Sequence, residues 1–170
     1  MVEQIQDFNQ GRYLLSTENP RSVKDTFCIG VACYPEKHYE SPNLEKDIRI
    51  LKHKVKMGAK YAITQMFFDN TYYWDLELRC KEEGIKIPII PGIKPITSAK
   101  QINLLASRFN ISIPHELVSA IEANPESAKE IGVEWCIDQS KDLYSKGVPM
   151  INYYSMGKSE NLIRVLNEVL

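Results

Sequence analysis

Short, continuous apolar runs alternate along the chain with segments whose apolar residues recur at helical spacing. The apolar runs cover residues 26–33, 61–68, 87–93 and 150–154. Runs of this length and character are typical of parallel strands that helices cover on both faces. The pattern therefore predicts an α/β fold built on a parallel sheet.

Helical segments fill the intervals between these runs, and residues that favour helix ends mark their limits. The first helix after a strand is expected to begin at Ser41-Pro42-Asn43 and to end at Gly58, because a cap residue followed by proline favours a helix start. Similar signals predict further helices over residues 70–84, after Thr97-Ser98, after Pro114, from Pro125 to Gly147, and over 159–170. Residues 1–10 also have helical spacing, whereas the polar residues 11–25 predict a loop.

The alternation of strands and helices indicates one domain over residues 1–170. Residues 1–25 are expected to form a residual helix and loop, and residues 26–170 to form four βα units. Four parallel strands suit two architectures. One is an open sheet of flavodoxin type, and the other is half of a (β/α)₈ barrel, whose usual length is about 250 residues. Periodicity alone does not choose between them.

Composition and charge narrow the function classes. Of the 170 residues, 44% are hydrophobic and 25% are charged, which is usual for a globular domain. A net charge of −1 gives no basic surface for nucleic acid or for an anionic membrane. The chain has no run long enough to span a membrane and no signal-peptide pattern, so a cytoplasmic location is expected. The scattered Cys28, Cys33, Cys80 and Cys136 predict reduced, mostly buried thiols and no metal site.

Polar and aromatic residues follow the first two predicted strands. Tyr34-Pro-Glu-Lys-His38 lies between the first strand and its helix, where Tyr34 can stack on a flat ring and His38 can donate to a ligand. Gln65 stands among apolar residues of the second strand, and a buried amide is costly unless it meets a partner. Parallel strands end at the same edge of a sheet, and α/β enzymes place their sites there.

Further candidates lie on the predicted helices and after the later strands. Asp47 and Lys54 are seven residues apart and fall on one helix face, beside its apolar stripe, although a solvated charged face has the same spacing. Gln101 follows the third strand, and Lys158 follows the fourth. Because no nucleotide-binding glycine motif or nucleophile–base pair occurs, any redox chemistry would come from a cofactor.

Taken in order along the chain, five motifs resemble the carboxyl-terminal half of methylenetetrahydrofolate reductase, from about Phe27 to the end. They are Gly-Val-Ala-Cys-Tyr-Pro-Glu-Lys-His38, Lys54-Val-x-x-Gly-Ala59, Ile63-Thr-Gln-x-Phe-Phe-Asp69, Pro88-Ile-Ile-Pro-Gly-Ile93 and Tyr153-Tyr-Ser-Met-Gly-Lys158. The resemblance implies strands five to eight of a (β/α)₈ barrel, with FAD across the carboxyl ends of the strands. It also implies that NADH or NADPH reduces FAD, which then reduces methylenetetrahydrofolate to methyltetrahydrofolate for methionine synthesis.

The resemblance assigns ligands to particular residues. It implies FAD contacts from Tyr34, His38, Asp47 and Lys54, and further FAD-lining positions at Ser41, Ile50 and His53, whose residue types differ from those of well-known members. Gln65 matches a glutamine that meets the nicotinamide donor and the folate ring in turn. Gln101 matches a folate-binding glutamine, and Lys158 stands where other members have an arginine that holds the glutamate tail of folate.

No catalytic residue is assigned, because the glutamate that serves the family as general acid lies in the amino-terminal half, which has no counterpart here. The chain is therefore expected to be a truncated or split product that is inactive alone. Its expected partner is a separate amino-terminal half or another copy of itself. Two alternatives stay open: an open-sheet module that binds FMN or another phosphate compound, and an inactive fragment.

Overall fold

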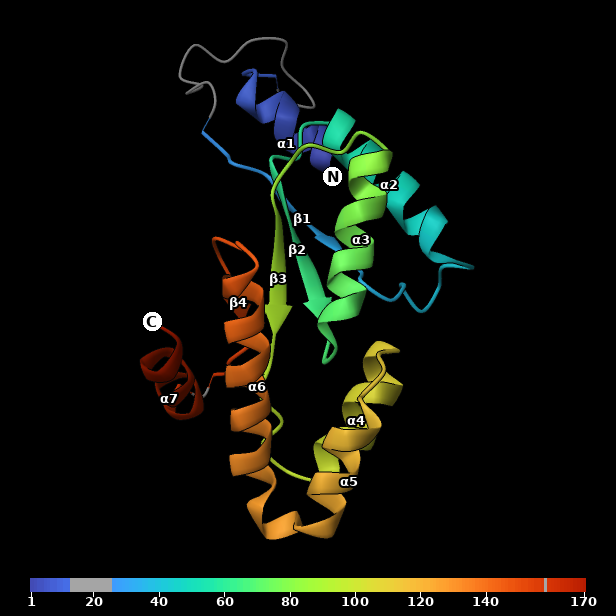
Figure 1. The fold of residues 1–170 in the computed structure, drawn as a ribbon. Coiled ribbons are helices and arrows are strands. Elements are labelled where there is room, and N and C mark those ends of the chain that lie inside the picture. Colours follow the sequence, from blue (N-terminus) through green and yellow to red (C-terminus); the bar gives the residue numbers. More distant parts are fainter. Residues whose placement is uncertain (13–25, 158) are drawn as a thin grey trace.

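The computed structural model describes residues 1–12, 26–157 and 159–170, and its centre is one parallel sheet (Figure 1). The strands β1 (Gly30–Cys33), β2 (Tyr61–Met66), β3 (Ile89–Ile93) and β4 (Asn152–Tyr153) pair in the order β1-β2-β3-β4. All three pairings are parallel. The predicted α/β class is thus confirmed, although each strand is shorter than its apolar run.

The order of the strands bears on the two architectures. Consecutive parallel strands that are also neighbours in space are the arrangement of (β/α)₈ barrels. In a flavodoxin-type sheet the strands are also parallel, but strand 3 is added on the opposite side of strand 1 from strand 2. Strand 1 therefore lies between strands 2 and 3. The observed sheet is consistent with a TIM-barrel-like fold, and its order argues against the open doubly wound sheet.

The helices form close to where the sequence predicts them. They are α1 (Val2–Asn9), α2 (Leu44–Lys56), α3 (Asn70–Glu82), α4 (Lys100–Phe109), α5 (His115–Ala123), α6 (Ala128–Ser145, after the 3₁₀ turn η1, Pro125–Ser127) and α7 (Glu160–Val169). The loop expected over residues 11–25 falls mostly outside the described residues.

The cap of α2 differs from the one that the sequence suggested. Asn43, not Ser41, is the N-cap residue, and its side-chain oxygen accepts the backbone N–H of Lys46 at 3.0 Å. The Ser41 hydroxyl donates to the Asn43 carbonyl at 3.1 Å and thus supports the cap from outside the helix. The proline between them is compatible with this arrangement because it lies before the first helical turn.

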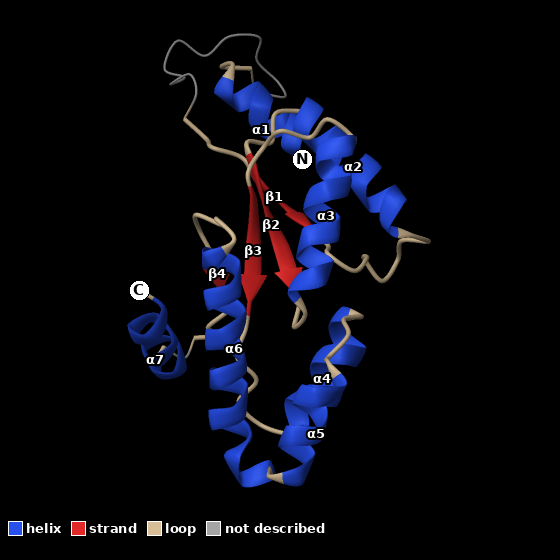
Figure 2. Cartoon of the chain, in the orientation of Figure 1, coloured by secondary structure: helices blue, strands red, loops and turns tan. Residues whose placement is uncertain are grey.

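The helices cover one face of the sheet, which corrects the expectation of a helical layer on each face (Figure 2). Buried and half-buried residues alternate along β2. On the opposite face, Gly30 and Ala32 are exposed. Side chains of a strand alternate between its two faces, and the strand residues that belong to hydrophobic clusters all point to the face that the helices cover. They are Val31, Cys33, Ala62, Met66, Ile89, Ile93 and Tyr153. Continuous apolar runs do not distinguish the two cases, because the strands of a barrel also bury both faces, one under helices and one in the barrel interior.

The helices of this layer cover different parts of the sheet. In the helical layer, α2 and α3 pack on β1 and β2 through residues such as Ile48 and Leu76. The long helix α6 packs on β3 through Leu143, and α7 packs on α6 through Val165. The helices α4 and α5 lie beyond the carboxyl ends of the strands, around Met66 (Figure 1).

Polar side chains from α6 hold the chain that leaves β2. Trp135 Nε1 donates to the carbonyl of Phe68 at 2.9 Å, and Gln139 Nε2 donates to the carbonyl of Phe67 at 3.1 Å. Asn70 Nδ2 donates in turn to the carbonyl of Gln139 at 3.0 Å. Carbonyls beyond a strand end have no ladder partner, so these side chains satisfy them while burying the segment.

One position of α6 must be glycine because the helix lies directly against the chain after β3. A Cβ atom at Gly132 would overlap the backbone carbonyl of Ile96. A carbonyl held in the buried backbone cannot rotate away as a flexible side chain would. This contact fixes how closely α6 approaches the carboxyl end of β3.

We expect Gly132→Ala to lower the free energy of unfolding by about 1–3 kcal/mol, the usual cost of overpacking a core. Helix propensity alone acts in the opposite direction, because alanine is better than glycine in a helix interior by about 1 kcal/mol. The sign of the change is therefore diagnostic. Urea unfolding followed by circular dichroism measures it, and a stabilised variant would contradict the close contact.

Candidate functional site

The sequence-predicted residues gather at the edge of the sheet where the strands end. Tyr34 follows β1, Gln65 is the penultimate residue of β2, and Gln101 lies in the first turn of α4, which follows β3. In Figure 1 this edge faces α4 and α5. Lys158 lies outside the described residues, so its predicted role stays a prediction.

The loop after β1 forms an aromatic cluster around His38. The ring of His38 lies 4.7 Å from that of Tyr34, edge to face, and 4.7 Å from that of Tyr39. The backbone N–H of His38 donates to Asp47 Oδ2 at 2.8 Å, which ties the loop to α2. Burial, and next the charge of Asp47, raise the pKa of Tyr34, which keeps its phenol neutral. Three predicted residues are thus brought together: Tyr34, His38 and Asp47.

The remaining predicted residues of α2 divide into two groups. Lys54 Nζ donates to the carbonyl of Ala32 at 3.2 Å, so the ammonium lies beside β1. Ile50 and His53 are exposed on the same helix. No ring contact or hydrogen bond links either side chain to the aromatic cluster among the described residues.

Glu36 is a residue of this loop that the sequence did not single out. Both of its carboxylate oxygens accept the backbone N–H of Ser112, at 2.8 and 2.9 Å. Ser112 lies between α4 and α5, so Glu36 joins the loop after β1 to the helices beyond β3. Burial raises the pKa of Glu36, while the N–H of Ser112 opposes the shift. No local sequence signal could have revealed a partner 76 residues away.

Gln65 occupies an irregular point of the sheet. The ladder between β2 and β3 shifts register between Ile63 and Met66. The N–H of Met66 donates to Gln65 Oε1 at 2.9 Å, so the side-chain oxygen serves a neighbouring backbone donor. The side chain is half-buried on the uncovered face, and its amide N–H₂ has no partner among the described residues. Two donor hydrogens are therefore available to a ligand.

A second consequence of the register shift is a close packing of three strands. The N–H of Gly92 donates to Thr64 Oγ1 at 2.8 Å, and the hydroxyl of Tyr154 donates to the Thr64 carbonyl at 2.8 Å. A Cβ at Gly92 would lie 2.5 Å from that carbonyl and 2.7 Å from the ring of Tyr154. Tyr154 thus crosses β3 to reach β2, and only glycine at position 92 leaves room for it.

Gln101 borders a cavity of about 280 Å³ between α4 and the chain after β4. Its Oε1 accepts the N–H of Thr97 at 2.9 Å, and its amide N–H₂ makes no hydrogen bond among the described residues. Tyr154 also lines this cavity. The predicted folate-binding glutamine is therefore at a real concavity, on the β3 side of the same sheet edge as the aromatic cluster.

Lys94 is a second residue that the sequence analysis missed, although a lysine between an apolar strand and a proline is unusual. Its side chain lines the Gln101 cavity and is 7% exposed. Nζ donates to the carbonyl of Pro95 at 3.3 Å, and no ion pair of Lys94 occurs among the described residues. Burial lowers the pKa of Lys94 below its ordinary value.

A cavity of larger volume lies elsewhere. A space of about 810 Å³ is bordered by Lys60, Tyr61 and Pro88 at the amino ends of β2 and β3, together with residues 146–152. None of the predicted ligand-binding residues lines it. Parallel-sheet enzymes bind ligands at the carboxyl ends of their strands, so the smaller cavity beside Gln101 has the stronger claim.

Other predictions about composition can be compared with the structure. Cys33, Cys80 and Cys136 are buried free thiols, as predicted, whereas Cys28 is exposed. Within residues 1–12, 26–157 and 159–170, no group of histidine, cysteine and acidic side chains could hold a metal ion. Over the same residues, no helix has the length and apolarity to cross a membrane.

Comparison with known proteins gives a consistent family. Residues 5–169 match the family model described as methylenetetrahydrofolate reductase. The chain is 36% identical over 137 residues to the 5,10-methylenetetrahydrofolate reductases of Pectobacterium carotovorum and Escherichia coli, which covers 79% of this chain and 46% of each relative. A probable methylenetetrahydrofolate reductase (NADPH) of Caenorhabditis elegans is 32% identical over 147 residues, which are 84% of this chain and 22% of that protein. The chain thus spans less than half the length of these relatives.

A solved structure supports the fold. A protein from Clostridium thermocellum, described as binding two copies of 5-methyl-5,6,7,8-tetrahydrofolic acid, superposes with a TM-score of 0.53. The match covers 86% of this chain and 54% of that one, at 21% sequence identity. At this level of identity the likeness concerns the fold.

The burial of Lys94 predicts a dependence of stability on pH. We expect Lys94→Met to raise the free energy of unfolding at pH 7 by about 1 kcal/mol, because it removes an amine that is buried with one weak hydrogen bond. In the wild type the unfolded chain holds the Lys94 proton more tightly, so between the lowered folded pKa and 10.5 this residue makes stability rise with pH. The advantage of the variant should therefore shrink towards pH 10.

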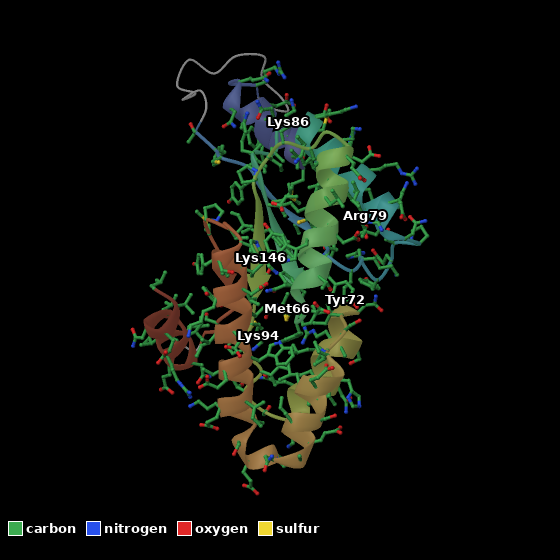
Figure 3. The ribbon with its side chains drawn as sticks, viewed as in Figure 1. Met66, Tyr72, Arg79, Lys86, Lys94 and Lys146 are labelled. Atoms are coloured by element: carbon green, nitrogen blue, oxygen red, sulfur yellow. The ribbon has the colours of Figure 1, made fainter. Side chains whose placement is uncertain are left out.

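Urea unfolding of the wild type and of Lys94→Met at pH 7 and at pH 10 measures the difference between their free energies of unfolding. The other titrating groups are the same in both proteins, so their contributions cancel in that difference. Lys86→Met is the matched control, because Lys86 is exposed and precedes β3 at the other end of that strand (Figure 3). An equal effect of the two substitutions at both pH values would contradict the assignment.

Proposed function

The chain belongs to the methylenetetrahydrofolate reductase family, and from that premise we propose that it takes part in the flavin-dependent reduction of 5,10-methylenetetrahydrofolate to 5-methyltetrahydrofolate. NADH or NADPH is the proposed hydride donor. The observation that carries the proposal is the cluster of Tyr34, His38 and Asp47 at the carboxyl end of β1, tied together by the 2.8 Å bond from the His38 N–H to Asp47. The described residues hold groups suited to a flavin dinucleotide at this edge.

The chemistry of these groups fits FAD. Asp47 uses one carboxylate oxygen for the loop, and its other oxygen can accept from ribose hydroxyls. Lys54 donates one N–H to the Ala32 carbonyl, and its two other N–H groups can donate to phosphate oxygens. Tyr34 and His38 supply flat surfaces and a ring N–H. When bound, FAD supplies the hydride transfer, and the protein groups hold and orient it.

Gln65 is the proposed substrate-facing residue. Its amide N–H₂ lies on the uncovered face of β2, at the carboxyl edge, with no partner in the described part of the chain. Because the Met66 N–H holds the side-chain oxygen, the orientation of the amide is set before a ligand arrives. Such an amide can donate to the carboxamide of a nicotinamide or to a pterin ring, which the two half-reactions present in turn. Gln101 is proposed to meet the folate from the β3 side.

The proposed reaction needs groups beyond these 170 residues. The sheet leaves its helix-free face uncovered and has β1 and β4 as its edges. Apolar strand faces and unpaired edges are costly in water, and closing a barrel removes both. We propose that four further βα units, from a separate amino-terminal half or from another copy of this chain, complete a (β/α)₈ barrel. The general acid would come from that half.

A substitution in the aromatic cluster tests the flavin site. We expect Asp47→Leu to weaken FAD binding by roughly tenfold or more, since hydrogen bonds to a charged group contribute about 1.5–3 kcal/mol. Flavin fluorescence quenching or equilibrium dialysis measures the affinity. Glu82→Leu is the control, because Glu82 is exposed at the end of α3. Circular dichroism confirms that both variants fold, and an unchanged affinity in Asp47→Leu would count against the site.

A complementation experiment tests the reaction. We expect the isolated chain to bind FAD weakly and to show no reduction of methylenetetrahydrofolate. Addition of the amino-terminal half of a family member should give a stable flavin spectrum and NAD(P)H-dependent turnover. Robust turnover by the isolated chain would show that the barrel does not have to be completed. FAD binding without turnover in the reconstituted protein would argue against the proposed activity.

A further inference from the structure

We propose that a cavity between α3, α5 and α6 binds a primary alkylammonium group. The cavity has a volume of about 350 Å³ and lies where the chain leaves β2, beside the starts of α3 and α5 and the interior of α6. It shares no lining residue with the cavity beside Gln101, and neither Tyr34 nor His38 lines it. The proposal does not depend on the reductase activity proposed above.

Two amide oxygens at this cavity have no hydrogen-bond donor. Asn70 and Gln139 both line the cavity, and Asn70 Oδ1 and Gln139 Oε1 are buried without a partner among the described residues. Gln139 as a whole is 6% exposed. Leaving a buried acceptor without a donor is costly, and native proteins contain few such groups. Two of them at one cavity therefore point to a donor that a ligand supplies.

The orientation of both amides is fixed by their N–H₂ ends. Asn70 Nδ2 donates to the carbonyl of Gln139 at 3.0 Å and to Asp142 Oδ2 at 2.7 Å. Gln139 Nε2 donates to the carbonyl of Phe67 at 3.1 Å. Exchanging oxygen and nitrogen in either amide would place an oxygen against these acceptors. The groups left for a ligand are therefore acceptors, and the ligand must carry N–H or O–H donors.

The carboxylates that line the cavity favour a positively charged donor. They are Asp69, Glu116 and Asp138, and no cationic side chain lines the cavity among the described residues. None of the three has an ion-pair partner in the described part of the chain. Glu116 and Asp138 are exposed, so they belong to the rim, whereas the buried amide oxygens belong to the floor. A cation with N–H donors is complementary to both parts.

Local helix chemistry explains only some of this lining. Asp69 Oδ1 accepts the N–H of Thr71 at 2.9 Å as the N-cap of α3, and Glu116 lies in the first turn of α5, where acidic residues are favourable. Asp138 lies in the interior of α6 and has no such role. Helix starts do not account for the two amide oxygens without donors. These oxygens distinguish a binding site from an ordinary pair of helix starts.

An alkylammonium group fits the cavity better than a metal ion. No group of histidine, cysteine and acidic side chains within the described ranges could hold a metal. An ammonium has three N–H donors and can serve two amide oxygens and one carboxylate together. Trp135 also lines the cavity, and an indole face attracts a nearby cation. Pockets for whole ligands have volumes of roughly 300–1,000 Å³, so this cavity of about 350 Å³ admits a short alkylamine or the end of a lysine side chain.

A ¹H–¹⁵N NMR titration of the intact chain tests the site with an internal control. The chain has two tryptophans, of which Trp135 lines this cavity and Trp74 does not. Butylammonium should shift the indole N–H resonance of Trp135 saturably and leave that of Trp74 unchanged. The variant Trp74→Phe assigns the two resonances. Tetramethylammonium has the same charge but no N–H donor, so it should bind roughly tenfold more weakly or less.

Substitutions at the rim test the charge without disturbing the floor. Asp138→Asn and Glu116→Gln each keep the size of the side chain and should weaken butylammonium binding by roughly two- to fivefold, as expected for exposed ion pairs. Glu122→Gln is the matched control, because Glu122 is an exposed carboxylate of α5 that does not line the cavity. It should leave the affinity unchanged, and circular dichroism checks that all three variants fold.

The comparison of ligands also identifies the source of the amine. Tighter binding of Nα-acetyl-lysine methylamide than of butylammonium would assign the site to a lysine of another chain, and the reverse order to a free amine; either result supports an alkylammonium site. Water that fills the cavity would satisfy the oxygens without a ligand, and the absence of a saturable Trp135 shift would overturn the proposal. Equal affinity for tetramethylammonium, or tighter binding of Mg²⁺ or Ca²⁺, would overturn it as well.

Discussion

The register shift between β2 and β3 is the constraint on which the rest of the sheet edge depends. A shift in a parallel ladder leaves backbone donors without their regular partners, and buried donors must find others. Here two consecutive side chains provide them: Thr64 accepts the N–H of Gly92, and Gln65 accepts the N–H of Met66. The same residues therefore repair the sheet and aim an amide at the uncovered face. The register shift thus accounts both for the local hydrogen bonds of β2 and for the orientation of the Gln65 amide.

The order of the strands decides how the candidate groups are distributed. Because β2 lies between β1 and β3, Gln65 separates the aromatic cluster of Tyr34 and His38 from the cavity beside Gln101. Glu36 bridges the two sides through the N–H of Ser112. A ligand above the strand ends would meet planar rings on one side, an amide in the middle and cations on the other. That sequence of surfaces suits two ligands that share one central contact.

Much of the fold could be predicted from the sequence, because helix ends depend on local chemistry. Proline and cap residues located α5, α6 and α2 within a few residues, although the capping side chain of α2 proved to be Asn43. The covering of the sheet could not be predicted, since an apolar run looks the same whether helices or a barrel interior cover its second face. The partners of Glu36 and Gln65 could not be predicted either. One depends on a contact 76 residues away, and the other on a register shift.

Three features of the sheet are unfavourable for the stability of the isolated chain, and for that reason they point to missing partners. A lysine is buried without an acidic partner in the described chain, an amide keeps two unused donors, and a sheet face with exposed Gly30 and Ala32 has no helical cover. A role in core packing alone would not require any of these features, because each lowers the stability of the folded chain. The lysine and the amide lie at or beside the carboxyl ends of the strands, where ligands would bind, and the uncovered face of β1 borders the space that further barrel strands would enclose. A completed barrel with its ligands would therefore supply the interactions that the isolated sheet lacks.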